Sequence, residues 1–270
     1  MGYGIRTRRG VRAVRIPYRP AMRAVIKWRM TSYGQFCAIA RAHDILGGRW
    51  TILIVRELLC GTRRFNDIQR GLPRISRTVL SERLQSLIHA GALMRVEGES
   101  GPEYLLTDAG RELSEVIKAL AIWGQRRLPR NTATEDLDID PVLVDMERRV
   151  RFDQLPPHPV MVRFELTKAK PRFLLLRRTE AMLCVRNEGY PEPVRIGGPL
   201  SALAAWWRGD VTFAGAQNQG LAIEGTREFR RAFPDWFERY AFAQILPAPR
   251  GPEPRRTLAR REVQKARRTG

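Results

Sequence analysis

The residues with the clearest chemical potential lie in an arginine-rich stretch in the first third of the chain. Between Arg63 and Arg83 the sequence carries six arginines against Asp67 and Glu82. Arginine neutralises backbone phosphate, and its planar guanidinium can read guanine through two parallel hydrogen bonds. This spacing favours a contact with nucleic acid. The alternative is a solvated helix face that is merely basic.

The glycine pair Gly47-Gly48, followed by Arg49, is a second chemical candidate because it could form a phosphate-binding loop. A phosphate cradle needs its glycines between a strand and a helix start, with free amides. Here apolar residues recur at helical spacing on both sides of the pair, over residues 36–60. We therefore expect one helix through this region, in which the missing side chains allow another element to approach.

Cysteine and histidine chemistry is sparse. Three cysteines, among them Cys37, form no C-x-x-C pair, and three histidines are scattered, so neither a disulfide framework nor a zinc site is predicted. Residues 151–245 lack a nucleophile elbow, a P-loop and an H-E-x-x-H motif. The sequence thus predicts a protein of the reducing cytoplasm that is not an enzyme and that needs no cofactor or metal.

The formal net charge is +20, and most of it lies near the two ends. Residues 1–29 contribute +9 without an acidic residue and residues 247–270 contribute +6, which leaves +5 for the rest. No run approaches the roughly 20 apolar residues of a membrane span, so no membrane partner is expected. The basic ends also leave open a protein that binds RNA without sequence preference.

Local patterns over residues 30–128 predict the elements that would position the arginines. Ser76 is a ready N-cap for a helix over 77–90, and Gly91 would end it. The other expected elements are a helix over 64–71, strands at 93–96 and 104–106, and a helix over 108–128 capped by Thr107. This order is that of a winged helix-turn-helix, whose second helix enters the major groove of DNA by its N-terminal residues.

Three motifs then resemble a known family: C-x-I-A-R-A-x-D-I-L-G-G-R-W-T-I-L-I-x-R-E-L-L, G-L-P-x-I-S-x-T-V-L-S-E-R-L and Y-x-L-T-x-A-G-R-E-L. Across residues 37–128 they closely resemble the HxlR-type bacterial transcriptional regulators. The resemblance implies a homodimer, paired through its first and last helices, that binds a pseudo-palindromic operator in double-stranded DNA. The residues expected to contact DNA are Arg63, Arg64, Arg74, Ser76, Arg77, Thr78, Ser81, Arg83 and Arg95.

The resemblance also bears on three local features. The wing, V-E-G-E-S-G-P-E-Y, is shorter and more acidic than in the family, which leaves Arg95 as its main phosphate contact. Cys37 falls where some relatives sense thiols or aldehydes, although a small residue packed at a helix start is the preferred interpretation. Relatives begin near Met30, so residues 1–29 are either a basic disordered arm or an over-called start.

The second half of the chain has its own organisation. Residues 129–150 are acidic and contain Pro129 and Pro141, which predicts a linker, and residues 246–270 predict a basic disordered tail. Residues 151–245 between them show an α+β order. The expected elements are strands at 160–166, 172–176, 181–186, 194–196 and 221–224, and helices over 199–208 and 226–237.

In this second block, L-x-A-L-x-x-W-W-x-G-D-V and I-E-G-x-x-x-x-x-R-A-F-P-D-W-F resemble the sterol-carrier-protein-2-like domain. That resemblance implies an apolar cavity between a curved sheet and its helices. For any single residue near it, a plain core position is the preferred interpretation. The candidate pocket residues are Val162, Phe164, Leu174, Leu183, Trp206, Phe213 and Trp236.

The expected fold class is α+β, an N-terminal winged helix-turn-helix followed by a C-terminal α+β sterol-carrier-like domain. The favoured function is a homodimeric, sequence-specific transcriptional regulator that an apolar small molecule modulates by changing the spacing of its two reading helices. The alternative is a carrier of lipid or another apolar ligand, in which the winged helix serves mainly for dimerisation.

Overall fold

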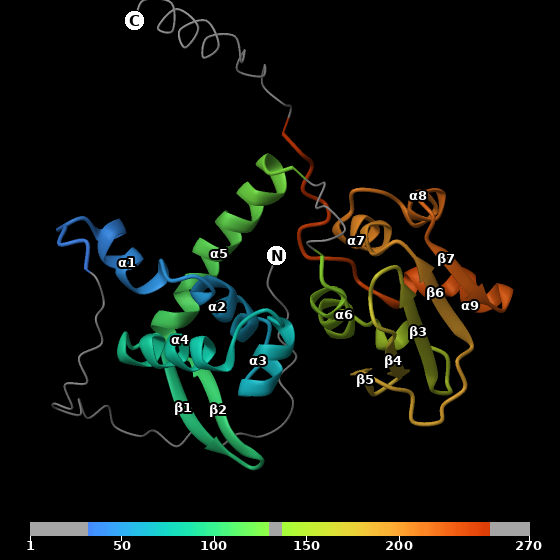
Figure 1. Ribbon diagram of the computed structural model, residues 1–270, viewed down its shortest axis with the longest axis horizontal. Coiled ribbons are helices and arrows are strands. Elements are labelled where there is room, and N and C mark those ends of the chain that lie inside the picture. The colour runs from blue at the N-terminus through green and yellow to red at the C-terminus, as the bar shows by residue number, and fades with distance from the viewer. Residues whose placement is uncertain (1–31, 130–136, 249–270) are drawn as a thin grey trace, which may run out of the picture.

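The computed structural model describes residues 32–129 and 137–248, which form two regions joined through a helix between them (Figure 1). Predictions made for residues 1–29 and for the tail beyond residue 248 lie outside these ranges. The first region is a winged helix-turn-helix, and the second is a five-stranded sheet with helices packed on it. In the described parts of the chain, no helix combines the length and apolarity that crossing a membrane requires.

The single helix expected over residues 36–60 is wrong: the structure divides it into α1 (Ala38–Leu46) and α2 (Thr51–Leu59). The break falls where Trp50 adopts a left-handed backbone with φ of 80°, which an α-helix cannot accommodate. A methyl group on Gly47 would overlap the His43 side chain. At Gly48 a methyl carbon would lie 2.9 Å from Arg83 Cζ, so the expected close approach of another element is seen there.

The helix-turn-helix elements follow their sequence signals closely. Helix α3 (Phe65–Gly71) leads through a short turn to α4 (Arg77–His89), whose N-cap Ser76 accepts a hydrogen bond from the Val79 amide at 3.2 Å. Strands β1 (Leu93–Gly98) and β2 (Gly101–Leu106) pair as an antiparallel hairpin. Helix α5 (Asp108–Arg127) follows, and its expected N-cap Thr107 accepts from the Gly110 amide.

The linker predicted over residues 129–150 is wrong in its second half, which forms helix α6 (Ile139–Arg148). Asp138 caps this helix by accepting from the Asp140 amide, and Pro141 stands in the first turn, where its missing N–H costs no helical hydrogen bond. The acidic and proline residues that suggested a linker are thus the start signals of a helix. The apolar residues of α6 belong to the C-terminal core, and they are Ile139, Leu143, Val144 and Met146.

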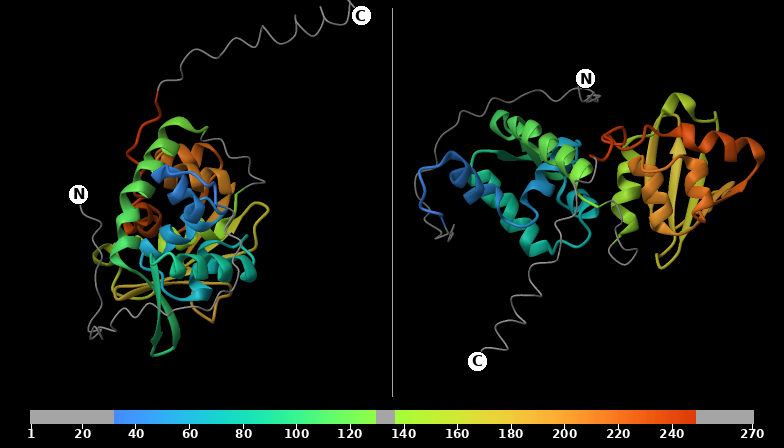
Figure 2. Two further views of the ribbon diagram at one scale, coloured as in Figure 1. Left: turned by 90° about the vertical axis from the view of Figure 1, so that its left-hand side faces the viewer. Right: turned by 90° about the horizontal axis from the view of Figure 1, so that it is seen from above.

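The C-terminal region is built on a mixed sheet with the strand order β5-β4-β3-β6-β7. Its strands are β3 (Val160–Leu166), β4 (Arg172–Arg177), β5 (Glu180–Cys184), β6 (Val194–Gly198) and β7 (Ala222–Gly225). Strands β3 and β6 are parallel and the other pairs antiparallel. Helix α7 (Leu200–Arg208) and α8 (Phe213–Asn218) follow β6, and α6 lies between the sheet and the winged helix (Figure 2).

The helix expected over residues 226–237 is shorter than predicted. Helix α9 (Arg227–Ala232) gives way to a 3-10 turn, Phe233–Trp236, because Pro234 cannot supply the N–H that a continuing helix needs. Helix α8 had no counterpart in the sequence prediction. One apolar cluster joins the inward side chains of the sheet to α6, α7 and this closing turn, with Phe164, Phe233 and Trp236 fully buried.

Candidate nucleic-acid interface

The start of α4 presents a polar, exposed edge to solvent. Leu80, Leu84 and Leu87 on the other side of the helix are fully buried in the core of the winged helix. Ser76, Thr78 and Ser81 are exposed. At 100° per residue, Thr78 and Ser81 fall within about 60° of each other on the helix surface. This edge has the size and polarity to meet base edges in a groove.

Arg77 locks this edge to the preceding helix. Its Nη1 donates to Asn66 Oδ1 and to Gln69 Oε1, both at 3.2 Å, and its guanidinium lies 4.9 Å from the centroid of the Phe65 ring. The three partners all belong to α3. Arg77 therefore fixes the position of the first turn of α4 while its side chain stays exposed.

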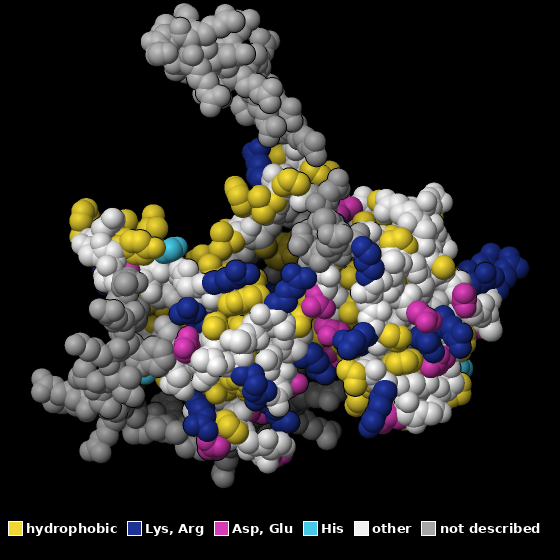
Figure 3. All heavy atoms as spheres, in the orientation of Figure 1, with side chains coloured by type: hydrophobic (Ala, Val, Ile, Leu, Met, Phe, Trp, Pro, Cys, Tyr) yellow, Lys and Arg dark blue, Asp and Glu magenta, His cyan; other side chains and the backbone are white. Residues whose placement is uncertain are grey.

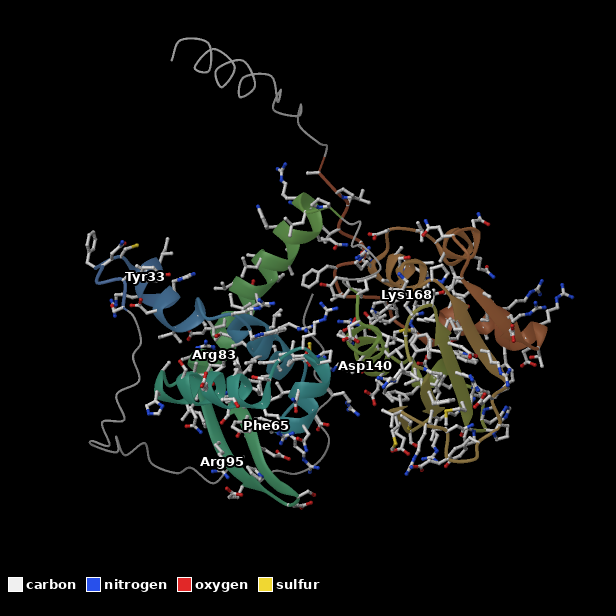
Figure 4. The ribbon with its side chains drawn as sticks, in the orientation of Figure 1. Tyr33, Phe65, Arg83, Arg95, Asp140 and Lys168 are labelled. Atoms are coloured by element: carbon white, nitrogen blue, oxygen red, sulfur yellow. The ribbon has the colours of Figure 1, made fainter. Side chains whose placement is uncertain are left out.

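Arg83 lies away from the exposed edge. It is about 140° around the helix from Thr78, and its guanidinium packs beside Gly48, at the turn between α1 and α2 (Figure 4). Its buried Nε has no hydrogen-bond partner among the described residues. The structure thus separates Arg83 from Thr78 and Ser81, with which the sequence had grouped it.

Arg63 and Arg64 are also separated from the α4 edge. Both pair with Glu103 of β2, at 3.9 and 3.7 Å. Together with Val144 and Arg148 of α6, they line a cavity of about 400 Å³ between the winged helix and the C-terminal region. They therefore face the second half of the chain while remaining about half exposed.

The remaining candidates lie on the turn and on the wing. Arg74 is exposed just before α4. Arg95 projects from β1 and pairs with Glu97 at 3.2 Å (Figure 4). The helical period also places Gln85 and His89, seven and eleven residues after Thr78, on the same side of α4 as Thr78.

Helices α1 and α5 carry a large apolar surface that nothing in the described chain covers. In α1, all of which is described, no residue is buried, and α5 buries Gly110 alone of its 20 residues. Hydrophobic side chains are visible along the far end of α5 and at the start of α1 (Figure 3). The exposed large side chains of this surface are Tyr33, Phe36, Ile39, Val116, Leu120, Trp123 and Leu128.

Comparison with known proteins assigns the first region. The family model for the HxlR-like helix-turn-helix matches residues 45–132. The HTH-type transcriptional regulator YvaP of Bacillus subtilis is 42% identical over 86 residues, which cover 31% of this chain and 80% of YvaP. This chain belongs to the HxlR-like family.

Other members are similar over the same segment. The HTH-type transcriptional regulator Rv3095 of Mycobacterium tuberculosis is 45% identical over 96 residues, 34% of this HxlR-like chain and 60% of Rv3095. The match thus spans about 60% of the length of that relative. The reduced form of the transcriptional regulator YodB from B. subtilis is 28% identical and covers 36% of this chain and 100% of its own, with a TM-score of 0.32. These relatives are transcriptional regulators, not enzymes.

The family match ends at residue 132, before the C-terminal region. The seven residues predicted to line a ligand pocket all lie in or against the apolar cluster of this region. Trp206 and Phe213 are in edge-to-face contact, with ring centroids 5.0 Å apart. A cavity of about 720 Å³ lies elsewhere, on the side of the sheet that carries Arg163 and Phe173. The structure thus places the seven residues as core.

Cys37 occupies the N-cap position of α1. The nearby backbone amides of Ala40 and Ile39 favour the thiolate and hold the pKa of its thiol below the usual value. By contrast, desolvation raises the pKa of the Cys60 and Cys184 thiols, although Cys60 is exposed by its accessible surface. In residues 32–129 and 137–248, no group of three or more His, Cys, Asp or Glu could hold a metal ion.

Proposed function

We propose that this HxlR-like protein is a homodimeric transcriptional regulator that reads duplex DNA with the N-terminal end of α4. The exposed edge of Ser76, Thr78 and Ser81, held in place by the Arg77 contacts to α3, is the observation that carries the proposal. Ser and Thr hydroxyls can donate to or accept from base edges in the major groove. Most transcriptional regulators of this architecture insert the same end of the second helix.

In this proposal the arginines contact phosphate and carry little sequence information. Arg74 and Arg95 flank the α4 edge on the turn and on the wing. Arg63 and Arg64 contact phosphate only after giving up their pairing with Glu103, and Arg83 acts by supporting α4 against Gly48. Each lost phosphate contact is expected to lower the slope of log K against log salt by about 0.9.

A homodimer follows from the open apolar surface of α1 and α5. Large exposed apolar patches on a soluble domain mark interaction sites. Two copies paired through these helices would present two α4 edges, and an operator with two half-sites about 34 Å apart would satisfy both. We therefore propose a pseudo-palindromic operator.

The test is selection of bound duplexes from a random library by the full chain, followed by affinity measurement on the selected sequence and on a shuffled one. The double variant Thr78→Ala, Ser81→Ala should lose the preference for the selected sequence while keeping its affinity for shuffled DNA. Thr167→Ala, an exposed threonine of the C-terminal region, is the control. A double variant that selects the same sequence as the native chain would refute the assignment of α4.

For the C-terminal region we propose a regulatory role that an apolar small molecule controls, in a sterol-carrier-like arrangement of sheet and helices. Support comes from the continuous apolar core between the sheet and α7, in which Trp206 and Phe213 meet. Since these residues pack as core, a ligand would have to part them, and tryptophan fluorescence during titration with a fatty acid would report it. The alternative, an apolar-ligand carrier with a purely dimerising winged helix, predicts this signal together with no sequence preference in the DNA selection.

A further inference from the structure

Helix α6 is fastened to the C-terminal region along its whole length. Asp140 accepts two hydrogen bonds from Arg172 of β4, at 2.6 and 3.0 Å. Asp145 Oδ2 accepts from Trp207 Nε1 of α7 at 2.8 Å, and Glu147 Oε1 accepts from the Leu183 amide of β5 at 2.9 Å. With its apolar side in the core, α6 must follow any displacement of the sheet or of α7.

The same helix is fastened to the winged helix by its last turn. Arg148 Nη2 donates to Glu57 Oε2 of α2 at 2.5 Å and to Thr62 Oγ1 at 2.7 Å. The other oxygen of Glu147 lies 3.8 Å from Arg70 Nη2 of α3. Two adjacent residues of α6 therefore hold two helices of the DNA-binding region.

Glu57 makes the junction between α6 and the winged helix, formed by Arg148–Glu57 and Glu147–Arg70, energetically costly to break. Its side chain is 1% exposed, and a buried carboxylate without a partner is strongly unfavourable. Arg56 Nη2 lies 2.8 Å from its Oε1, so both oxygens face cations. Burial disfavours the charged form of Arg148, but its hydrogen bond to Glu57 dominates together with nearby carboxylates and leaves the Arg148 pKa raised. Gly71, at the end of α3, also packs on Glu57, since a methyl group there would overlap the carboxylate.

We propose that α6 couples the two regions: a displacement of the C-terminal sheet or of α7 reaches α3 through Arg148–Glu57 and Glu147–Arg70. Other residues of the same helix, Phe65, Asn66 and Gln69, then pass the displacement of α3 to the first turn of α4 through their contacts with Arg77. The regulatory meaning of this route rests on the proposed function. It gives an effector in the C-terminal region a physical path to the reading edge, as coupling between two sites requires.

The alternative is that the junction is a passive interface that stabilises both regions without transmitting anything. A second link between the regions, Gln125 Nε2 to the Arg208 carbonyl at 3.3 Å, ends on α5. Amide exchange in α3 therefore separates the α6 route from this one.

The experiment is a cycle of four full-length proteins, followed by hydrogen exchange without DNA. Trp207→Phe removes the hydrogen bond to Asp145 and keeps an aromatic ring in the core. Glu57→Gln with Arg148→Met removes both charges of the Glu57–Arg148 pair together, and Arg56, whose side chain is 35% exposed, remains solvated. In the native background, Trp207→Phe should speed exchange in α3 by up to about a hundredfold, the limit set by one lost hydrogen bond to a carboxylate. In the double-variant background only the longer Glu147–Arg70 contact, at 3.8 Å, still joins α6 to α3 by charge, so the same substitution should speed α3 exchange by less than about twofold.

Exchange in β4 and β5 should rise with Trp207→Phe in both backgrounds, which shows that the perturbation is present. An equal rise in α3 in both backgrounds, or a rise in neither, would overturn the coupling. Arg149→Ala is the matched control for the loss of an arginine from α6, because Arg149 pairs with Asp145 of its own helix and not with the winged helix. In this background Trp207→Phe should speed α3 exchange as much as it does in the native protein. If Glu57→Gln with Arg148→Met does not fold by circular dichroism, Arg148→Lys replaces it and should give an intermediate suppression. Since no DNA is present, the result stands whether or not the DNA-binding proposal holds.

Discussion

Helix α5 spans 20 residues and buries only Gly110, whereas α7 spans nine residues and buries six, among them Trp206 and Trp207. Both helices are amphipathic, so the contrast lies in what surrounds them. The C-terminal region encloses α7 with the sheet and the closing turn. Helices α5 and α1 pack some apolar residues on the winged-helix core, such as Ile117 and Ile45, and leave others exposed, such as Trp123 and Ile39. A helix that keeps Trp123 57% exposed gains little stability from that ring among the described residues. The C-terminal region therefore buries the apolar surface of its helix, whereas the winged helix leaves part of its own exposed.

The largest effects should separate two tryptophans on these helices. Trp206→Ala in α7 removes a ring that is 2% exposed and should lower the free energy of unfolding by about 3–5 kcal/mol. Trp123→Ala in α5 should lower that of the monomer by less than about 1 kcal/mol, because the ring has few neighbours to lose. Urea denaturation at nanomolar concentration measures both. Similar losses for the two variants would contradict the contrast.

One charge on the exposed side of α5 should weaken the proposed dimer. Leu120→Glu places a carboxylate in the middle of the exposed side of α5, where dimerisation would have to bury it. We expect the dimer dissociation constant to rise about a hundredfold, or about 2.7 kcal/mol, with an unchanged circular dichroism spectrum. Sedimentation velocity over a concentration series gives the constant. Met182→Glu, at an exposed apolar position of the C-terminal sheet, should leave it unchanged if that region is complete alone.

Two glycines of α5 sharpen the comparison within one helix. A methyl group on Gly110 would overlap the backbone carbonyl of Ala92, which cannot move aside easily, whereas one on Gly124 would meet only Leu128 Cδ1 at 3.8 Å. Gly110→Ala should destabilise by about 2 kcal/mol, and Gly124→Ala should stabilise by about 0.5–1 kcal/mol. Thermal melting in the Leu120→Glu background avoids effects on the dimer. Destabilisation by Gly124→Ala would show that the far end of α5 is already packed.

The sequence allowed elements to be predicted wherever the deciding signal is local. Ser76 and Thr107 cap their helices by bonds that span three residues, and both were predicted from those residue types. Helix α6 was missed because an aspartate cap and a first-turn proline are also what a linker contains. Which interpretation applies depends on whether Leu143 and Met146 meet a core, and that core is formed by residues downstream.

In the candidate DNA-binding site, too, features set by local sequence could be predicted and those set by distant contacts could not. That Thr78 and Ser81 share one helix side follows from the helical period, but the direction of Arg63 and Arg64 does not. Their side chains turn to Glu103 and α6 because of contacts that lie far away in the sequence. The pair Glu57–Arg148 spans 91 residues, and no local pattern marks either residue as a partner of the other.

The smallest effect tests the exposed start of α1 at its N-cap residue, Cys37. Because amides of Ala40 and Ile39 lower the pKa of the Cys37 thiol while desolvation raises those of Cys60 and Cys184, Cys37 should hold the largest thiolate fraction at pH 7.5. Thiolate is the form that reacts with iodoacetamide, so Cys37 should be alkylated several-fold faster than the other two, as mass spectrometry of quenched samples would show.

Ala40→Pro removes one of the two amides at a position in the first helical turn that tolerates proline. The pKa of Cys37 should then return toward its ordinary value and alkylation at pH 7.5 should slow. The Leu120→Glu background keeps the protein monomeric, so that a partner cannot shield the thiol. If all three cysteines reacted at one rate there, the start of α1 would not activate Cys37 relative to Cys60 at the end of α2 and Cys184 in β5. A Cys37 that is fast in the monomer and slow in the native protein would place this residue at the interface of the proposed dimer, beside the exposed apolar side chains of α1.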